Sequence, residues 1–135
     1  MRRLALVIGL TFVGGIMLGV IGDHLLHAQQ SPIKRTEVLK TDMPGMDGKE
    51  AHMWIGDIAP GAATGTHRHS TPRFVYVMEG SVVLEMEGKP AQTFKAGQGF
   101  MESPDAPHNF KNSSTSETAK ALGFQIAGKG QPLQY

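Results

Sequence analysis

Beyond residue 50 the sequence is divided into short apolar runs by turn residues, and this spacing limits what the chain can fold into. The runs span His52 to Ile58, Phe74 to Met78, Val82 to Glu87, Ala91 to Lys95, Phe100 to Ser103, His108 to Lys111 and Ala119 to Ala127. Such lengths, with Gly or Pro between the runs, are typical of strands. Seven or eight strands in about 100 residues predict an all-β sandwich, jelly roll or small barrel.

Composition agrees with an all-β fold. The chain has 17 Gly and 8 Pro, which favour a turn-rich architecture over a helical bundle. The polar stretch from Gln29 to Lys49 is expected to supply turns, at 43–45 and 47–48, and no strand is assigned to it. The absence of cysteine excludes disulfides, thiolate metal sites and cysteine nucleophiles.

The N-terminal segment predicts export. Arg2 and Arg3 precede an uncharged stretch at 4–22, and Ala28 supplies a small residue for cleavage. A signal peptide removed after residue 28 and an uncleaved membrane anchor both fit this pattern. Either one would be a hydrophobic helix, with the arginines on the cytoplasmic side. We therefore expect a leader or anchor at 1–28 and a domain at 29–135, periplasmic or held at the outer face of the inner membrane.

Charge limits the partners of that domain. Without residues 1–28, 11 basic and 11 acidic residues remain. A balanced domain has no electrostatic reason to bind nucleic acid or an anionic membrane surface, so no nucleic-acid partner is expected. Contact with a membrane would be confined to residues 4–22 of an uncleaved chain.

Three histidines are candidate metal ligands. His67 and His69 are two residues apart, so on extended backbone their side chains point the same way. His108, from a distant strand, would close a three-imidazole site with open positions for water or substrate. Such a site accepts Fe, Mn, Ni, Cu or Zn. The alternative is an exposed turn and an unrelated loop histidine.

The spacing around these histidines resembles that of a protein family. Gly61-x5-His67-x-His69-x3-Arg73-x6-Gly80 is similar to the first cupin motif, and Gly97-x5-Ser103-x-Asp105-x2-His108-x3-Asn112 to the second. The resemblance extends from about Ile33 to Leu133. It implies a small single-domain cupin of the RmlC-like type: a jelly-roll barrel with a pocket in its mouth and frequent dimerisation. It also implies that His67, His69 and His108 are the metal ligands.

One departure from the family pattern concerns the site itself. Arg73 stands where the family has a Glu ligand, and a guanidinium cannot coordinate a cation. Arg73 could grip an anionic substrate beside a three-histidine centre, replace the metal in an anion site, or be neutralised by Glu102. Glu102 shares strand parity with Phe100, so it faces inward if Phe100 does; otherwise it is an ordinary solvent-facing acid.

These residues lead to two functional hypotheses. The first is an exported metal-dependent enzyme acting on a small anionic molecule, with dioxygenase-type chemistry ahead of isomerase or lyase chemistry. Arg73 would be its catalytic residue, orienting an anionic group or stabilising negative charge. The second is a non-catalytic binding or sensing module that uses Arg73, with or without metal. A homodimer is expected from the family, and Phe74, Tyr76 and Met78 share a face that could serve packing or a dimer.

Overall fold

The structure is a computed structural model that describes residues 32–135. The predicted signal peptide or anchor, its hydrophobic helix and the proposed boundary after residue 28 lie outside the described residues. Within 32–135, no helix is long and apolar enough to cross a membrane.

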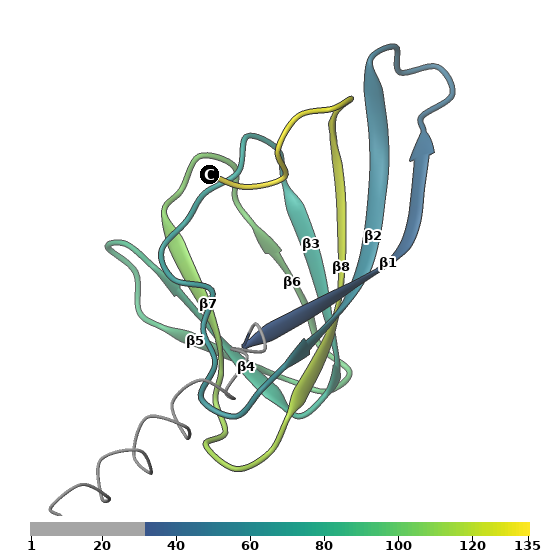
Figure 1. Cartoon of the computed structure of the whole chain (residues 1–135). Helices are drawn as coiled ribbons and strands as arrows, with labels where there is room; N and C mark the ends of the chain where they lie inside the picture. The colour runs from purple at the N-terminus through teal and green to yellow at the C-terminus, as the bar shows by residue number, and fades with distance from the viewer. Residues whose placement is uncertain (1–31) are drawn as a thin grey trace, which may run out of the picture.

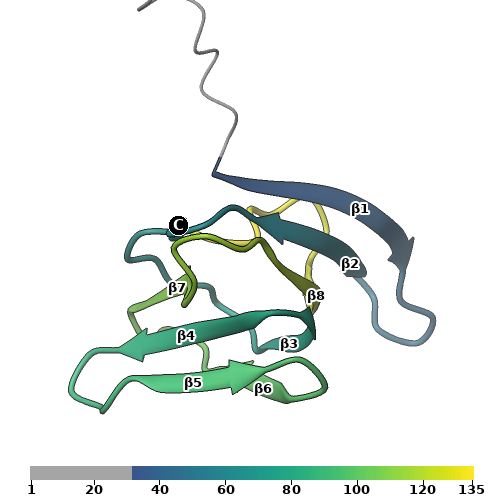
Figure 2. The same ribbon diagram turned by 90° about the horizontal axis from the view of Figure 1, so that it is seen from below.

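Eight antiparallel strands form two facing sheets in this part of the chain (Figures 1 and 2). The strands are β1 (Ile33–Asp42), β2 (Lys49–Ile58), β3 (Arg73–Glu79), β4 (Ser81–Met86), β5 (Gln92–Lys95), β6 (Gly99–Glu102), β7 (His108–Asn112) and β8 (Ala119–Gly128). The larger sheet has the order β1-β2-β8-β3-β6 and the smaller one β5-β4-β7. This arrangement confirms the predicted all-β jelly roll.

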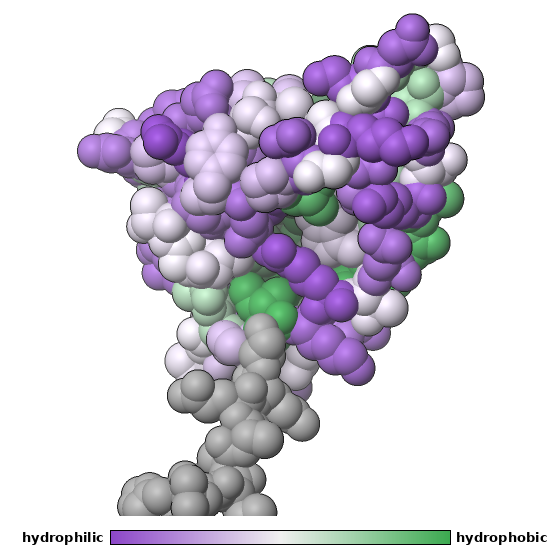
Figure 3. Space-filling model, turned by 45° about the horizontal axis from the view of Figure 1, so that its top comes forward, coloured by the Kyte–Doolittle hydropathy of each residue, from purple (hydrophilic) through white to green (hydrophobic). Residues whose placement is uncertain are grey.

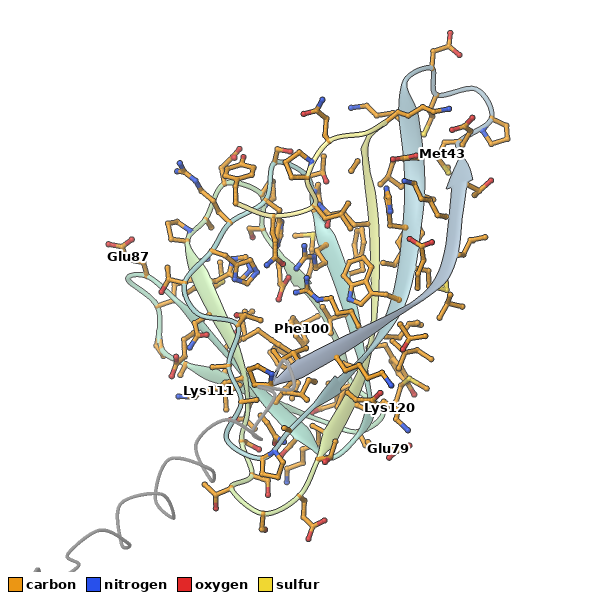
Figure 4. All side chains as sticks on the ribbon, in the orientation of Figure 1. Met43, Glu79, Glu87, Phe100, Lys111 and Lys120 are labelled. Carbon is orange, nitrogen blue, oxygen red and sulfur yellow. The ribbon has the colours of Figure 1, made fainter. Side chains whose placement is uncertain are left out.

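Strand β1 corrects the expectation that residues 29–49 hold only turns. It pairs along the whole of β2, with a bulge between Glu37 and Leu39. Almost all of its side chains are exposed, so its sequence shows no apolar alternation. Backbone pairing to β2 stabilises it, and its charges are typical of an edge strand. The turns expected beyond it are present, at the hairpin tip marked by Met43 in Figure 4.

The apolar core fills one end of the barrel and leaves the other end for polar residues. Along β3 the inward side chains change from Arg73 to Val75 and Val77, and the two valines are buried. Phe100 lies inside the barrel and stacks on Phe94, with ring centroids 4.2 Å apart (Figure 4). The charged end of β3 therefore belongs to the mouth.

Candidate metal centre

The backbone places two of the predicted histidines side by side. His67 lies in the extended segment before β3 and pairs with His108 of β7 through two backbone hydrogen bonds, 2.9 and 3.0 Å long. The centroids of their rings are 4.5 Å apart. His69, two residues further, lies 6.0 Å from His67 and 4.9 Å from His108 by the same measure. The structure thus brings together the three histidines predicted from the motif.

Backbone carbonyls fix the tautomer of all three rings. The Nδ1 atoms of His67, His69 and His108 lie 3.0, 2.9 and 2.7 Å from the carbonyl oxygens of Gly65, Thr71 and Ala106. A carbonyl only accepts, so each Nδ1 carries a proton. In the neutral imidazole, Nε2 then keeps its lone pair. This is the arrangement that orients histidines as metal ligands.

Glu102 supplies a carboxylate to the same point. Its side chain is only 2% exposed, and Oε2 lies 3.1 Å from Nε2 of His69 and 3.5 Å from Nε2 of His108. The four ligand atoms all lie within 4.8 Å of one another. Glu102 is therefore not an ordinary solvent-facing acid: it follows the inward parity of Phe100. It stands directly opposite Arg73 in the β3–β6 register.

The residues present fit a divalent transition ion. The Nε2 atoms of His67 and His108 are buried and have no hydrogen-bond partner, which is costly for a nitrogen lone pair. Three imidazoles and one carboxylate form a donor set that Fe, Mn, Ni, Cu and Zn accept. A bound cation would satisfy both orphaned nitrogens and the Glu102 carboxylate. His67, His69, Glu102 and His108 are thus the residues that could hold it.

The pKa shifts follow from burial and close contacts. Burial opposes ionisation of Glu102, but its close contacts with the imidazoles of His108 and His69 and the nearby Arg73 outweigh this and lower its pKa to about 2. Burial lowers the pKa of His67 and keeps that ring neutral. For His108 burial is the largest single effect, but the contact with Glu102 and the hydrogen bond to the Ala106 carbonyl together outweigh it and raise the pKa. Protons therefore compete with a metal more strongly at His108 than at His67.

Arg73 is packed beside the ligand cluster and is only 4% exposed. Nε donates to Oε1 of Gln125 (3.1 Å), and Nη2 donates to the carbonyl oxygen of Leu133 (3.0 Å). Its guanidinium carbon lies 5.1 Å from the ring centroid of Trp54, a cation–π distance. Nη1 lies 3.7 Å from Oε2 of Glu102. Of the three arrangements open from the sequence, neutralisation of Arg73 by Glu102 matches these contacts.

A cavity of about 40 Å³ extends from the ligand cluster into the barrel. Its lining includes Trp54, Thr64, His67, Arg73, Val75 and Phe110. This volume has room for a few water molecules or a ligand of a few heavy atoms. Figure 3 looks toward this end of the barrel, where hydrophilic side chains surround small hydrophobic areas. The cavity combines apolar walls with a few polar groups, as small-molecule sites do.

Some residues of the site were not identified from the sequence. Arg35 lines the same cavity, but it belongs to β1, which the sequence pattern did not reveal. Gln125, which accepts a hydrogen bond from Arg73, could not be identified from the sequence, where it is only one polar residue within an apolar run. His52, by contrast, is a buried residue of β2 with Nε2 3.3 Å from Oε1 of Glu50, and it is not in the ligand cluster.

Comparison with protein families gives the class. Residues 54–123 match the model described as Cupin domain, which is more than half of the chain. The chain belongs to the cupin domain family. The sequence has no significant match among curated proteins.

Solved structures share the fold at low sequence identity. The DMSP lyase DddQ from Ruegeria pomeroyi DSS-3 superposes with a TM-score of 0.61 at 15% identity, over 94% of this chain and 58% of that one. An RmlC-like cupin from Shewanella frigidimarina NCIMB 400 gives 0.58 at 17%, over 74% and 80%. KdgF from Halomonas sp. gives 0.56 at 18%, over 72% and 82%. The chain spans about half the length of the DMSP lyases that it resembles.

Proposed function

We propose that this protein is a metal-dependent enzyme that acts on a small anionic molecule. The observation that carries the proposal is the convergence of three imidazole nitrogens and the Glu102 carboxylate within 4.8 Å at the mouth of a jelly-roll barrel. Two cationic side chains, Arg35 and Arg73, line the adjoining cavity. A divalent ion held by these ligands would supply Lewis-acid polarisation of a substrate oxygen.

The donor set favours lyase or isomerase chemistry over dioxygenase chemistry. From the sequence, dioxygenase-type chemistry is the first expectation, because the motif predicts three histidine ligands and no carboxylate ligand. Glu102 would add a fourth ligand, which leaves fewer open positions for O2 and a substrate to bind the ion together, whereas lyase or isomerase chemistry needs a position for the substrate alone. The similarity to a DMSP lyase structure supports the same choice.

The residues around the ion would orient the ligands, bind the substrate and exclude water. The carbonyl-bound histidines keep their Nε2 atoms directed at the ion, so little reorganisation is needed on binding. Arg73 would hold the anionic group of the substrate or stabilise negative charge that develops on it. Val75 and Phe110 form an apolar wall that excludes water from one side of the cavity.

Elemental analysis of the full chain, purified without chelator or affinity-tag histidines, tests this proposal. We expect about one transition-metal ion per chain, reduced in His67→Ala and Glu102→Gln. His52→Ala is the matched control, because it removes a buried histidine that is outside the cluster. Absence of metal from the wild-type chain, or equal loss in the His52 variant, would contradict the metalloenzyme.

A second candidate is a binding or sensing module that performs no chemistry. It is favoured by the contacts of Arg73, whose guanidinium is held by Gln125, Leu133 and Trp54 and so has little freedom to follow a reacting group. Turnover distinguishes the two functions. A metal-loaded chain that binds small anions but leaves them chemically unchanged, followed by mass spectrometry, would support the module.

Export and dimerisation complete the proposal. The basic start and uncharged stretch of residues 1–28 support transport of the domain out of the cytoplasm. Cell fractionation of the full chain is expected to recover it in the periplasm or with the inner membrane, and recovery in the cytoplasm would contradict export. A homodimer is supported by exposed apolar side chains on β3 and β6.

A further inference from the structure

Two arginines in the barrel mouth donate to one neutral oxygen. Nη2 of Arg35 lies 2.9 Å from Oε1 of Gln134, and Nη1 of Arg73 lies 3.4 Å from the same atom. The Trp54 ring lies near both, with its centroid 6.0 Å from the guanidinium carbon of Arg35 and 5.1 Å from that of Arg73. Two cations therefore converge on a position that a side-chain amide now occupies.

This arrangement leaves positive charge unbalanced. Glu102 is the only acid within 4 Å of Arg73, while Arg35 has no ion pair of its own among the described residues. With neutral histidines the two arginines and Glu102 sum to one positive charge, and a divalent ion would add to it. An amide oxygen carries only a partial charge, so it compensates two guanidinium groups poorly.

We propose that the Gln134 amide occupies the binding position of a small carboxylate, which Arg35 and Arg73 bind together when it replaces that side chain. This inference rests on the proposed anionic substrate and names its chemical class. It also assigns Arg35 as a residue that determines specificity. The guanidinium of Arg35 presents several donors in one plane, which suits a carboxylate oxygen pair.

The shape of the amide supports a carboxylate over a tetrahedral anion. A carboxamide and a carboxylate are both planar groups of three heavy atoms with nearly the same dimensions, so the space that holds one admits the other. The cavity beside it is small, and a surface hollow lined by Ile33, Arg35, Thr64 and Gln134 adjoins it. Phosphate and sulfate are bulkier and carry oxygens out of that plane.

Exchange requires only the side chain of Gln134 to move. The backbone on either side of it is held: the carbonyl oxygen of Leu133 accepts from Arg73, and Tyr135 exchanges two backbone hydrogen bonds with Arg68, 2.9 and 3.0 Å long. A carboxylate could then form the charge-assisted bonds while this segment stays in place.

Calorimetric titration of the full chain with propionate tests the inference. Propionamide serves as the neutral probe of the same shape and inorganic phosphate as the tetrahedral one. We expect propionate to bind tightest of the three. Arg35→Gln should weaken it about tenfold or more, since a charge-assisted bond is lost. Gln134→Ala should strengthen it severalfold, because more of the protein is then free to bind.

Matched controls lie next to each variant. Lys34→Gln removes a neighbouring charge from β1, and Gln131→Ala shortens an exposed glutamine of the same segment. Equal propionate affinity in the Arg35 and Lys34 variants would overturn the role of Arg35. If Gln134→Ala bound propionate no more tightly than Gln131→Ala, the replacement of the Gln134 amide by a carboxylate would be overturned. Tighter binding of phosphate, or no binding of propionate at millimolar concentration by wild type or Gln134→Ala, would overturn the ligand class.

Metal content measured on the same samples separates this inference from the proposed function. Titrations are run on the protein as purified and after treatment with a chelator. Propionate binding that depends on Arg35 in metal-free protein would support the carboxylate site even if the chain proves not to hold a metal. One metal ion per chain together with binding that ignores Arg35 would support the proposed function and overturn the inference.

Discussion

At the scale of single residues, the acidic residue of the centre lies on a different strand from the one that the family pattern predicts. The family pattern puts the carboxylate on β3, but here Arg73 occupies that position and Glu102, its direct partner on β6, supplies the carboxylate. Opposite residues of an antiparallel pair have Cβ atoms about 5 Å apart, so a carboxylate on either strand can reach the same point beside the histidines. Each residue compensates the other, and the ligand set keeps an acid.

Acid titration of the metal-free chain should reveal the Glu102 ion pair. The pKa of Glu102 falls from 4.5 to about 2 on folding, so its contribution to stability is complete above pH 4.5 and is lost as the pH drops toward 2. We expect the wild type to lose about 3 kcal/mol more unfolding free energy over this range than Glu102→Gln. Urea unfolding at a series of pH values measures this difference; parallel curves for the two proteins would contradict it.

The site could be predicted only where residue spacing is the signal. Histidines in a fixed pattern can be read from the sequence, and all three lie together. To place Glu102 in the site, one must know which face of β6 is inward. To place Arg35 and Gln134 together, one must know a contact between residues 99 positions apart in the sequence. Local pattern carries no information on such contacts.

At the scale of elements, β2 and β8 fit together because the large ring of Trp54 on β2 packs over a glycine of β8. Trp54 stands opposite Gly123 in the register, and a Cβ built on Gly123 would come within 2.4 Å of the indole. The glycine lets the Trp54 ring lie flat against β8. From there the ring contacts Arg35 and Arg73, so a backbone feature of β8 positions the cations of the mouth.

The variant Gly123→Ala should displace Trp54. The methyl group must push the ring away, and overpacking of this kind costs about 1–3 kcal/mol of unfolding free energy. Propionate affinity should fall with it, because both arginines lose the surface on which they pack. Gly56→Ala is the control on β2: its added Cβ would meet nothing closer than 3.9 Å. Equal stability of the two variants in urea would contradict this account.

Asn112 connects β7 to the end of β2 and to the loop before β8, at the apolar end of the barrel. Its buried Nδ2 lies 3.0, 3.2 and 2.7 Å from the carbonyl oxygens of Ile58, Ala59 and Glu117. Asn112→Ala leaves these acceptors short of a donor, and we expect a loss of about 2–4 kcal/mol in unfolding free energy. Asn109→Ala on the same strand breaks two partly exposed bonds, one donated to Glu85 and one accepted from Thr64, and should cost about 1 kcal/mol. Similar thermal denaturation of both variants would contradict the difference.

Prediction of elements succeeded where burial alternates and failed where it does not. The runs at β3 and β4 have clear inward and outward faces, and both strands are present. Strand β1 is exposed along its length, so its sequence resembles that of a polar loop. Its position is set by hydrogen bonding to β2, which residue types do not encode.

At the scale of the whole molecule, the outer face of the larger sheet carries an apolar patch on β3 and β6. Phe74, Tyr76 and Met101 come from adjacent strands, are about half exposed, and lie in register across β3 and β6. Contiguous apolar area of this kind on a small protein is typical of an interface. It supports the homodimer expected from the family.

Replacement of two of these residues should prevent the proposed homodimer from forming. In sedimentation velocity we expect the full-length wild type to behave as a dimer and Tyr76→Lys/Met101→Lys as a monomer, because burying two unpaired ammonium groups is unfavourable. Lys89→Glu, in the β4–β5 turn on the other sheet, should not change the oligomeric state. A monomeric wild type at all concentrations would contradict the dimer.

The position of Trp54 makes the barrel mouth directly observable by optical spectroscopy. It is the only tryptophan of the chain, so intrinsic emission at long excitation wavelengths comes from this one indole. The guanidinium groups of Arg35 and Arg73 lie within about 6 Å of it. Both groups would shift when a ligand replaces the Gln134 amide to which they donate. Each arrival of a ligand in the mouth would therefore change the fluorescence, and unlabelled protein could be screened against small acids in a stopped-flow instrument.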